Sequence, residues 1–507
     1  MSGCGGIPRP PQRPAAGSLI DAHAHIFNAT DIPAADFIKI VFLSHYPEQG
    51  LVKTLDLRAS GIVEALVDLF VFIVTNASPS AREEMRVLRG TDAPRFEYAS
   101  RRGTETLVTD RVASYLAAPR LQADDASEAV RGAIVAAGTD GTARLSGDLS
   151  QAGAREIALN AYKSDVDIGV YLRWFGLFTR YRYSLADELA GDHARLGYQT
   201  RLLAPAMVDF TKWFDIRSDI GLSPLHQQVE LMGLIGRRLG GPSVRGYVAF
   251  DPLREALHRA GLGGTSPLAL VEEAIRHQGF VGVKLYPPMG FKPWNNGDQP
   301  YPRQVTDFFG GRMKTSRALN TALGDLYDLA VTLDVPILAH AADSNSAGPY
   351  YARRGDPYHW IPVWENWPRL RVCLAHFGSF DAISEGAPAG THLPEASWEY
   401  VLGGYLRRHP DVGVFADLSF YAEVLDADPA YRAGLARAFR GFVDRYDPEV
   451  RHIVFGSDWI MLGSQREHLF YAERLVEFLR KDCVLSAEQV ERVLIHNANA
   501  FLGAAVT

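Results

Sequence analysis

The side chains best suited to chemistry in this chain are histidines and an aspartate that close short, mainly apolar segments. His23 and His25 occur in the sequence DAHAH, and because side chains alternate along a strand, both imidazoles would point to one side. His340, His376 and Asp458 close three further apolar runs. Imidazole and carboxylate groups bind zinc and similar divalent metals. A single histidine at a strand end is more often structural, but these strand ends together predict a metal site.

Strands must deliver these side chains, and eight short apolar runs are predicted to be strands: Leu19–His23, Leu202–Val208, Val244–Phe250, Val281–Tyr286, Pro336–His340, Arg371–His376, Val412–Leu418 and Ile453–Ser457. Helical patterns lie between most of them, at Leu225–Leu239, Pro267–Gln278, Ser316–Thr332, Ser397–Arg408 and Ala430–Tyr446. This alternation favours an α/β fold, a (β/α)8 TIM-type barrel with catalytic residues at the C-terminal strand ends. A doubly wound open sheet is the alternative, although no glycine-rich phosphate loop follows the first strand.

The segment between the first two strands is much longer than an ordinary connection. We predict a large, mainly helical insertion over 26–200, with helices at Phe37–His45, Gly61–Thr75, Thr106–Leu116 and Glu156–Leu189 and a flexible linker or loop at Gln122–Gly153. It would form either a lid over the barrel mouth or an oligomerisation subdomain, for which we consider a homodimer. The predicted organisation is a disordered lead-in over 1–18 and a barrel over 19–507, interrupted by 26–200.

Composition excludes several classes of function. The 507 residues are 47% hydrophobic and 22% charged, which is typical of a soluble globular protein. The formal net charge of −7 gives no general attraction to nucleic acid or anionic membranes, and we predict no membrane span. Three cysteines are too few for a disulfide framework and fit a reducing, cytoplasmic location. A small-molecule substrate is therefore expected.

Several motifs at these strand ends form a known pattern. They are DxHxH in the first strand, PILAH at 336–340, LAHFG at 374–378, FGSDW at 455–459 and a closing segment HNANAFLG at 496–503. With these motifs the sequence resembles the amidohydrolase superfamily, in particular the amidohydrolase-related branch (amidohydrolase 2) that includes aminocarboxymuconate-semialdehyde decarboxylase. The resemblance covers the barrel and not Ile26–Arg201.

The resemblance implies a ligand set and roles. His23, His25, His340 and Asp458 would bind one divalent metal ion, with Zn²⁺ expected and Mn²⁺ as the other candidate. A metal with an open position lowers the pKa of its water to about 7, so that hydroxide is available at neutral pH. His376 would lie beside this water, and Asp458 and His376 would be the catalytic proton carriers.

Lys284 allows two interpretations. In binuclear members of the superfamily a lysine on the fourth strand is carboxylated and bridges two metals, but this branch generally has one metal. We therefore expect Lys284 to bind an anionic group of the substrate, with a structural ion pair as the other reading. The further candidates for substrate binding are Tyr286, Trp294, Arg353 and Arg354, which lie in the sequence around and after the fourth and fifth strands.

The branch contains hydrolases, decarboxylases and hydratases, and fold alone cannot choose between them. We favour a metal-dependent hydrolase that cleaves an amide, lactone or ester bond of a small, carboxylated substrate through a metal-bound hydroxide. The DxHxH opening favours this reading over a nonoxidative decarboxylase of an aromatic or muconate-like acid, which is the second hypothesis. A catalytically silent binding barrel is the third.

Overall fold

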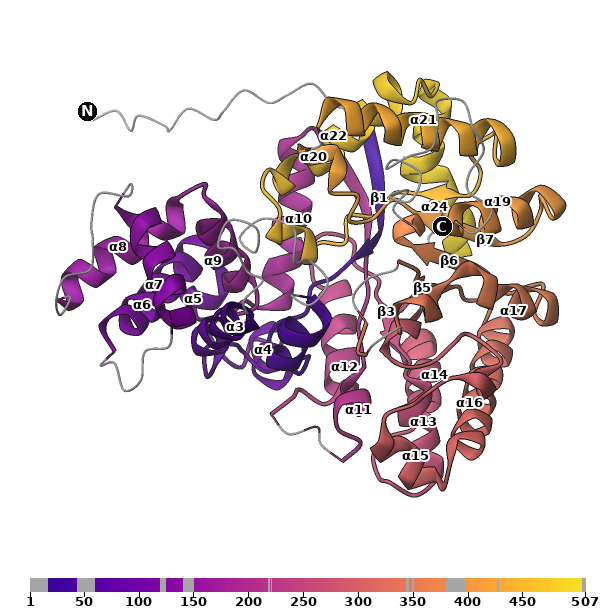
Figure 1. Ribbon diagram of the computed structural model, residues 1–507, viewed down its shortest axis with the longest axis horizontal. Coiled ribbons are helices and arrows are strands. Elements are labelled where there is room, and N and C mark those ends of the chain that lie inside the picture. The colour runs from indigo at the N-terminus through magenta and orange to yellow at the C-terminus, as the bar shows by residue number, and fades with distance from the viewer. Residues whose placement is uncertain are drawn as a thin grey trace.

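Parallel strands form the centre of the computed structural model, with helices around them (Figure 1). The structure describes residues 17–42, 60–118, 125–139, 150–217, 219, 221–342, 346–348, 351–378, 397–426 and 428–503. Most of the predicted 1–18 lead-in lies outside them.

All eight predicted strands are present, as β1 (Gly17–Ala24), β2 (Tyr198–Pro205), β3 (Tyr247–Ala249), β4 (Gly282–Leu285), β5 (Ile337–His340), β6 (Val372–Ala375), β7 (Val414–Asp417) and β8 (Ile453–Val454). They form a two-stranded sheet, β1-β2, and a six-stranded sheet in the order β3-β4-β5-β6-β7-β8, and every pair is parallel. The parallel β/α class is thus confirmed. Among the described residues, no single sheet closes through all eight strands.

Backbone contacts cross both gaps between the two sheets. Isolated parallel bridges join Leu203 to Val244 and Ala206 to Tyr247, next to β2 and β3. On the other side, Ala22 N donates to Phe455 O at 3.1 Å and Ser457 N donates to His23 O at 2.9 Å. One buried apolar cluster is made by residues in or next to all eight strands and by α24 (Asn497–Leu502). It contains Ile20, Ala22, Leu202, Ala204, Ala206, Tyr247, Val281, Leu338, Cys373, Ala375, Phe415, Val454, Ala498, Phe501 and Leu502.

Helices that follow the strands begin at residues suited to capping. Asp251, Ser266 and Asp428 cap α13 (Pro252–Arg259), α14 (Pro267–His277) and α21 (Pro429–Tyr446), and each is followed by proline at the first helical position. The predicted helices are confirmed as α12 (Leu225–Gly236), α14, α16 (Arg312–Leu333), α19 (Trp398–Arg408) and α21. α13 was not predicted; it is short and follows β3 directly.

A group of helices lies between β1 and β2 in the chain, and most of it forms a lobe beside the strands (Figure 1). They are α1 (Ala34–Asp36), η1 (Phe37–Phe42), α3 (Ser60–Val74), α4 (Ala81–Leu88), α5 (Phe96–Ala99), α6 (Arg101–Ala117), α7 (Asp125–Gly138), α8 (Gln151–Lys163), α9 (Asp167–Leu177) and α10 (Arg182–Arg195). The linker prediction for Gln122–Gly153 was wrong over 125–138 and 151–153, which belong to α7 and α8 because alanine-rich sequence favours a helix, and 122–124 and 140–149 lie outside the described residues. The predicted helix Glu156–Leu189 is three helices, interrupted near Ser164 and Tyr181.

A buried ionic network ties this lobe to the loop after β1. Arg182 donates to both carboxylate oxygens of Asp31, at 2.9 and 2.6 Å, and to Glu84 at 3.1 Å. Burial lowers the pKa of Arg182, but the two carboxylates more than offset this effect and raise it. Because these charges are buried and mutually paired, the lobe has a defined attachment to the strand body.

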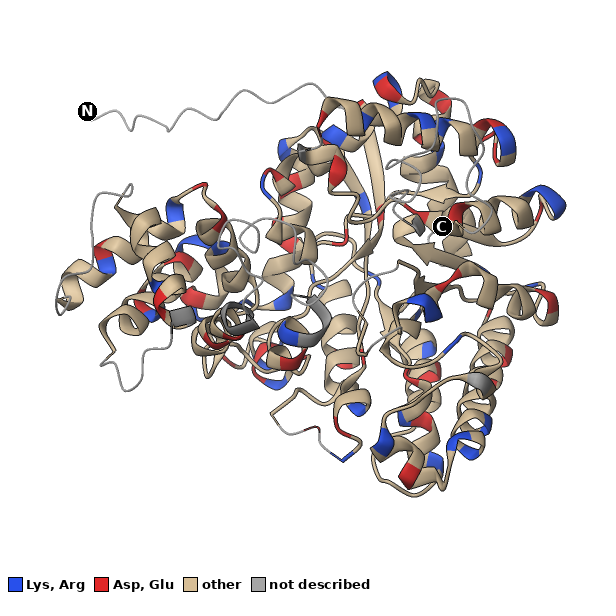
Figure 2. Ribbon diagram, viewed as in Figure 1, with Lys and Arg blue, Asp and Glu red and all other residues tan. Residues whose placement is uncertain are grey.

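Positively and negatively charged residues are interspersed over the helices (Figure 2). No helix of the described part has the length and apolarity needed to cross a bilayer.

Candidate metal centre

His23 in β1, His25 directly after β1 and Asp458 after β8 meet at the C-terminal ends of the strands. His25 Nε2 lies 3.1 Å from Asp458 Oδ1, and His23 Nε2 lies 3.6 Å from the same oxygen. All three residues are buried, and their ligand atoms lie within 4.8 Å of one another. Three of the four predicted ligands are therefore brought together.

The opposite nitrogen of each histidine is held by a hydrogen bond. His25 Nδ1 donates to the carbonyl oxygen of Ala206 at 2.7 Å, and His23 Nδ1 donates to Asp417 Oδ2 at 3.0 Å. A proton on Nδ1 leaves the lone pair on Nε2, which in both rings faces Asp458. Histidines that bind metals are oriented by partners of this kind.

This donor set fits a divalent metal. Two neutral imidazole nitrogens and one carboxylate oxygen match the ligands of catalytic zinc sites, which keep a further position open. Burial, followed by the charge of Lys284, lowers the pKa of His23 to about 3, so this ring is neutral at pH 7 and its nitrogen is available. Burial raises the pKa of Asp458, but the neighbouring histidines, His25 foremost, outweigh burial and lower it to about 2, so the carboxylate is ionised.

Asp458 is positioned by the turn after β8. Its backbone has φ of +54°, and its N–H donates to His23 O at 2.8 Å. Asp21 supports the same turn, because its carboxylate accepts from Ser457 N at 3.0 Å and from Ser457 Oγ at 2.6 Å. The first and last strands are thereby joined at the base of the cluster.

His340 and His376 form a neighbouring pair. His376 Nε2 lies 3.2 Å from His340 Nδ1, and the His376 ring is 5.2 Å from the His23 ring between centroids. His340 stacks on Tyr286 at 4.4 Å. The fourth predicted ligand thus adjoins the cluster through His376, but it is not in the group whose ligand atoms lie within 4.8 Å.

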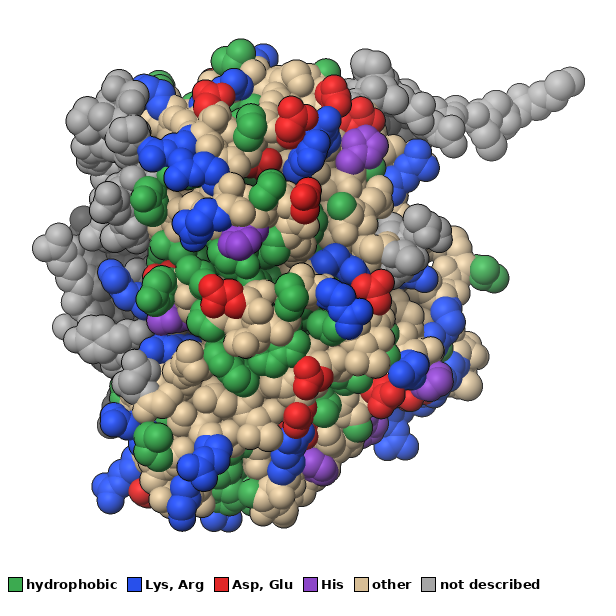
Figure 3. Space-filling view, turned by 90° about the vertical axis from the view of Figure 1, so that its right-hand side faces the viewer, with side chains coloured by type: hydrophobic (Ala, Val, Ile, Leu, Met, Phe, Trp, Pro, Cys, Tyr) green, Lys and Arg blue, Asp and Glu red, His purple; other side chains and the backbone are tan. Residues whose placement is uncertain are grey.

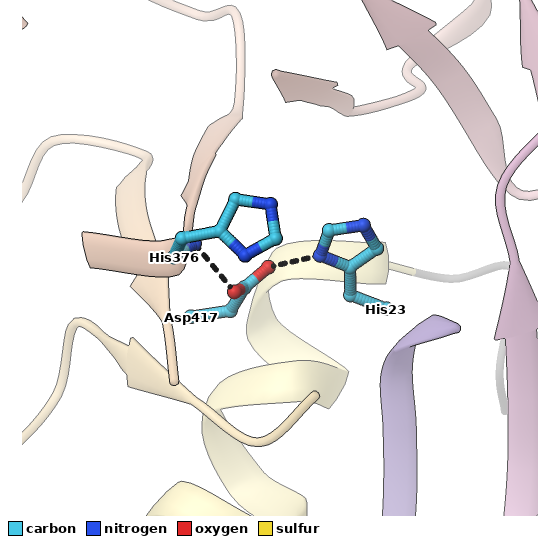
Figure 4. Close-up of side chains that lie close together, drawn as sticks. All are labelled: His23, His376 and Asp417. Atoms are coloured by element: carbon cyan, nitrogen blue, oxygen red, sulfur yellow. Dashed lines mark hydrogen bonds and ion pairs between the residues drawn. The ribbon is translucent and has the colours of Figure 1, made fainter. Parts of the chain in front are cut away.

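Asp417 and Ser419 connect these two parts of the site, and Figure 4 shows Asp417 between His23 and His376. Asp417, at the end of β7, binds His23 Nδ1 with one oxygen and accepts from the His376 backbone N–H at 2.9 Å with the other. Ser419 Oγ lies 2.9 Å from His23 Nδ1 and 3.0 Å from His376 Nδ1. The charges of His23 and His376, with these hydrogen bonds, outweigh burial and hold the pKa of Asp417 well below its usual range.

The ligand atoms of His23, His376 and Asp417 also lie within 4.8 Å of one another, close enough to bind one metal ion. In this second group Asp417 already accepts hydrogen bonds on both oxygens, so its better role is to orient His23 and His376. From its position in the sequence, Asp417 is one of several aspartates at or near predicted strand ends, with Asp209 and Asp251, and nothing local separates it from them. Ser419 carried no signal.

Lys284 is buried on β4 and reaches the cluster, where its ammonium lies 3.0 Å from His23 Nε2. Burial lowers its pKa to about 8, although the charges of Asp458 and Asp417 oppose this effect. Lys284 therefore lies among the predicted ligands, and Tyr286 lies beside it, with its ring centre 5.8 Å from the lysine nitrogen.

The other predicted substrate residues lie in different surroundings. Trp294 packs on Trp367 and Tyr327 and lines a groove of about 1030 Å³ beside α16 and α17 (Ile361–Asn366). That face of the molecule has hydrophobic side chains gathered in its middle (Figure 3). Arg354 is buried over the ring of Tyr351 and donates to Pro300 O, whereas Arg353 is exposed. None of the contacts described for these three residues is with the histidine cluster.

Loss of the Asp417 charge should weaken the whole arrangement. We expect Asp417→Asn to lower metal affinity by about 10- to 100-fold, which is the usual effect of removing a partner of a metal-binding histidine. Competition with a metal-sensitive dye would measure the affinity. Asp307→Asn, in an exposed ion pair with Arg303, is the matched control; equal affinity in the two variants would contradict the role given to Asp417.

The fold and the cluster define a parallel β/α protein with a histidine and carboxylate centre of metal-binding type. Residues 254–504, just under half of the chain, match the model of the amidohydrolase family. The match includes β4 to β8 with His340, His376 and Asp458, and does not reach His23 and His25 in β1. No curated protein matches the chain.

Several solved structures are similar to parts of the chain. An amidohydrolase from Burkholderia multivorans with bound HEPES has 14% identity and a TM-score of 0.39, covering 65% of this chain and 91% of its own. A second structure of an amidohydrolase from Burkholderia multivorans, with bound zinc, has 15% identity and a TM-score of 0.35, covering 65% of this chain and 91% of its own. A Pseudomonas putida protein assigned as a 2-pyrone-4,6-dicarboxylic acid hydrolase has 17% identity, a TM-score of 0.35, and 62% and 86% coverage. TM-scores this low do not establish a common chemistry.

Proposed function

We propose that this protein is a metal-dependent hydrolase of the amidohydrolase family that cleaves an amide, lactone or ester bond in a small, carboxylated substrate. The observation that carries the proposal is the convergence of His23 Nε2 and His25 Nε2 on one oxygen of Asp458. The family match over 254–504 supports the same class of chemistry.

In this proposal His23, His25, His340 and Asp458 bind one divalent metal ion, for which zinc suits an imidazole-rich set better than manganese. When bound with an open position, such a metal lowers the pKa of a water molecule towards about 7 and polarises a carbonyl oxygen. Lys284 Nζ occupies the space in front of His23 Nε2, so the ammonium must move aside for the ion.

The protein's own groups then move protons and hold the substrate. Asp458 is ionised at neutral pH and accepts a proton from the attacking water. His376, held at Nδ1 by Ser419, relays that proton from Asp458 to the leaving group, so that Asp458 is ionised again when the bond has broken. Lys284 and Tyr286 bind the substrate's anionic group, because they are the predicted substrate residues that lie beside the cluster.

We further propose that the eight strands act as one barrel and that the helices between β1 and β2 cover its mouth. Trp174 of α9 donates to the carbonyl oxygen of Ile460 at 3.0 Å, two residues after Asp458. Asp167, at the start of the same helix, pairs with Arg466 at 2.6 Å. These contacts place α9 against the loop that follows the site, as a lid that excludes water would require.

A substrate screen tests the hydrolase proposal. Metal-loaded protein would be offered lactones, amides and esters that carry a carboxylate, and separately aromatic and muconate-like acids. Release of acid from the first set, followed by pH-stat titration, is the expected result. Release of carbon dioxide from the second set, with the first set untouched, would replace the hydrolase by a decarboxylase.

Removal of the metal should abolish the reaction. We expect dialysis against a chelator to eliminate hydrolysis, and one equivalent of Zn²⁺ per chain to restore it and to raise the melting temperature, because the ion binds only the folded state. Metal analysis alongside the rate would check the stoichiometry. Two equivalents at full activity would instead indicate a binuclear centre bridged by a modified Lys284, and activity that survives complete chelation would contradict the metal role.

A further inference from the structure

A pocket outside the histidine cluster lies between α11 (Thr211–Phe214), α13 and the start of α12. Its volume is about 420 Å³. Besides the exposed Arg217, two cations line it: Lys212 on α11 and Arg254 on α13. Both side chains are largely buried, with 10% and 15% of their surface exposed.

Both cations bind one carboxylate from the chain itself. Asp219 accepts from Arg254 through both of its oxygens, at 3.0 Å each, and its Oδ2 lies 2.9 Å from Lys212 Nζ. The Asp219 side chain is 48% exposed, far more than either cation. It therefore enters from the solvent side and occupies a place shaped for a carboxylate.

A second, buried carboxylate holds Arg254 in place independently of Asp219. Asp209 accepts from Arg254 Nε at 2.5 Å and from Nη2 at 2.8 Å, with only 2% of its side chain exposed. Among these four side chains, two positive charges face Asp209 and Asp219. If Asp219 leaves, the carboxylate of an external ligand can accept the hydrogen bonds that Lys212 and Arg254 now donate to Asp219.

The rest of the wall sets the kind of anion. Five leucine side chains line the pocket: Leu225, Leu257 and Leu270 from α12, α13 and α14, Leu222 from the loop before α12 and Leu262 from the loop after α13. An apolar wall beside a paired cation site suits a carboxylate that carries a short hydrocarbon body, because the body buries apolar surface while the head group keeps its hydrogen bonds.

We propose that Lys212 and Arg254 form a binding site for a small organic carboxylate with an apolar body, and that Asp219 is a built-in competitor that fills the site when no ligand is bound. The site shares no residue with the metal cluster. The proposal therefore does not depend on the hydrolase function.

Hexanoate is a suitable probe, and isothermal titration calorimetry of the full chain measures its binding. We expect the Asp219→Asn variant to bind hexanoate at least about tenfold more tightly than the parent protein does. In the parent, the Asp219 carboxylate is part of the same chain and competes with hexanoate at an effective concentration in the millimolar range. Hexan-1-ol, which lacks the charge, should not gain affinity. Adding Lys212→Met to Asp219→Asn should remove the gain, while Asp307→Asn alone should behave like the parent.

A crystal structure of the parent protein soaked in hexanoate gives a second readout that does not depend on a variant. The expected result is the hexanoate head group between Lys212 and Arg254, with Asp219 displaced. Unchanged affinity in a folded Asp219→Asn variant, or soaked crystals that keep Asp219 in place with no hexanoate in the pocket, would overturn the proposal and leave an ordinary ion pair.

Discussion

Replacing Asp458 by asparagine is expected to lower turnover by about a thousandfold, within the range that a positioned acid or base contributes. Asparagine keeps the size of the side chain but removes both the negative charge that faces His23 and His25 and the ability to accept a proton. Metal content should fall as well, because the ion loses its anionic ligand. Steady-state rates at saturating metal, with metal analysis on the same samples, would measure both effects.

The Asp307→Asn variant again serves as the control, since it removes one aspartate charge from an exposed ion pair. It should retain full activity and metal. If Asp458→Asn turned over its substrate within a few-fold of the parent, Asp458 would be neither ligand nor proton carrier, and the proposed centre would fail.

His376→Ala is expected to lose most of its turnover, about 10²- to 10⁴-fold, while it keeps the metal. The reason is that His376 carries protons in the proposal but is not a ligand. Metal content and rate, measured together on parent and variant, would separate the two roles.

The contact between His376 Nε2 and His340 Nδ1 gives this experiment a sharp alternative. If His376 only orients His340, metal affinity and activity would fall together, and activity would return at high metal concentration. That outcome would make His376 a positioning residue. Activity equal to the parent at all metal concentrations would remove it from the mechanism.

Sequence periodicity was sufficient to locate the strands, because each is a short apolar run between polar turns. Val372–Ala375 and Ile337–His340, for example, fall within the predicted ranges. On β5 and β7 the side chains alternate as expected for a strand. Leu338 and Phe415 belong to the buried apolar cluster, and the buried His340 and Asp417, two residues after them, lie on the same faces of these strands. The strand ends that carry these side chains could therefore be predicted.

Other features depend on contacts that sequence does not encode locally. On β1, Ile20 and Ala22 face the interior, so strict alternation would turn His23 away, but the strand has a register shift between Asp21 and Ala24. Ser419 reaches His23 only because β7 lies near β1 in space. The sequence could not show whether Trp294 binds substrate or packs against another residue, because a tryptophan in a loop can do either. In the structure it packs on Trp367.

The hydrogen bonds between Asp21 and Ser457 join positions 436 residues apart. His23 and His25 precede Asp458 by more than 400 residues, so a growing chain carries both histidines long before the carboxylate of the proposed centre is made. Contacts of such high sequence separation slow folding, because a long loop must close before they form. If the proposed centre forms, its metal would therefore be loaded after β8 has been synthesised and has joined β1.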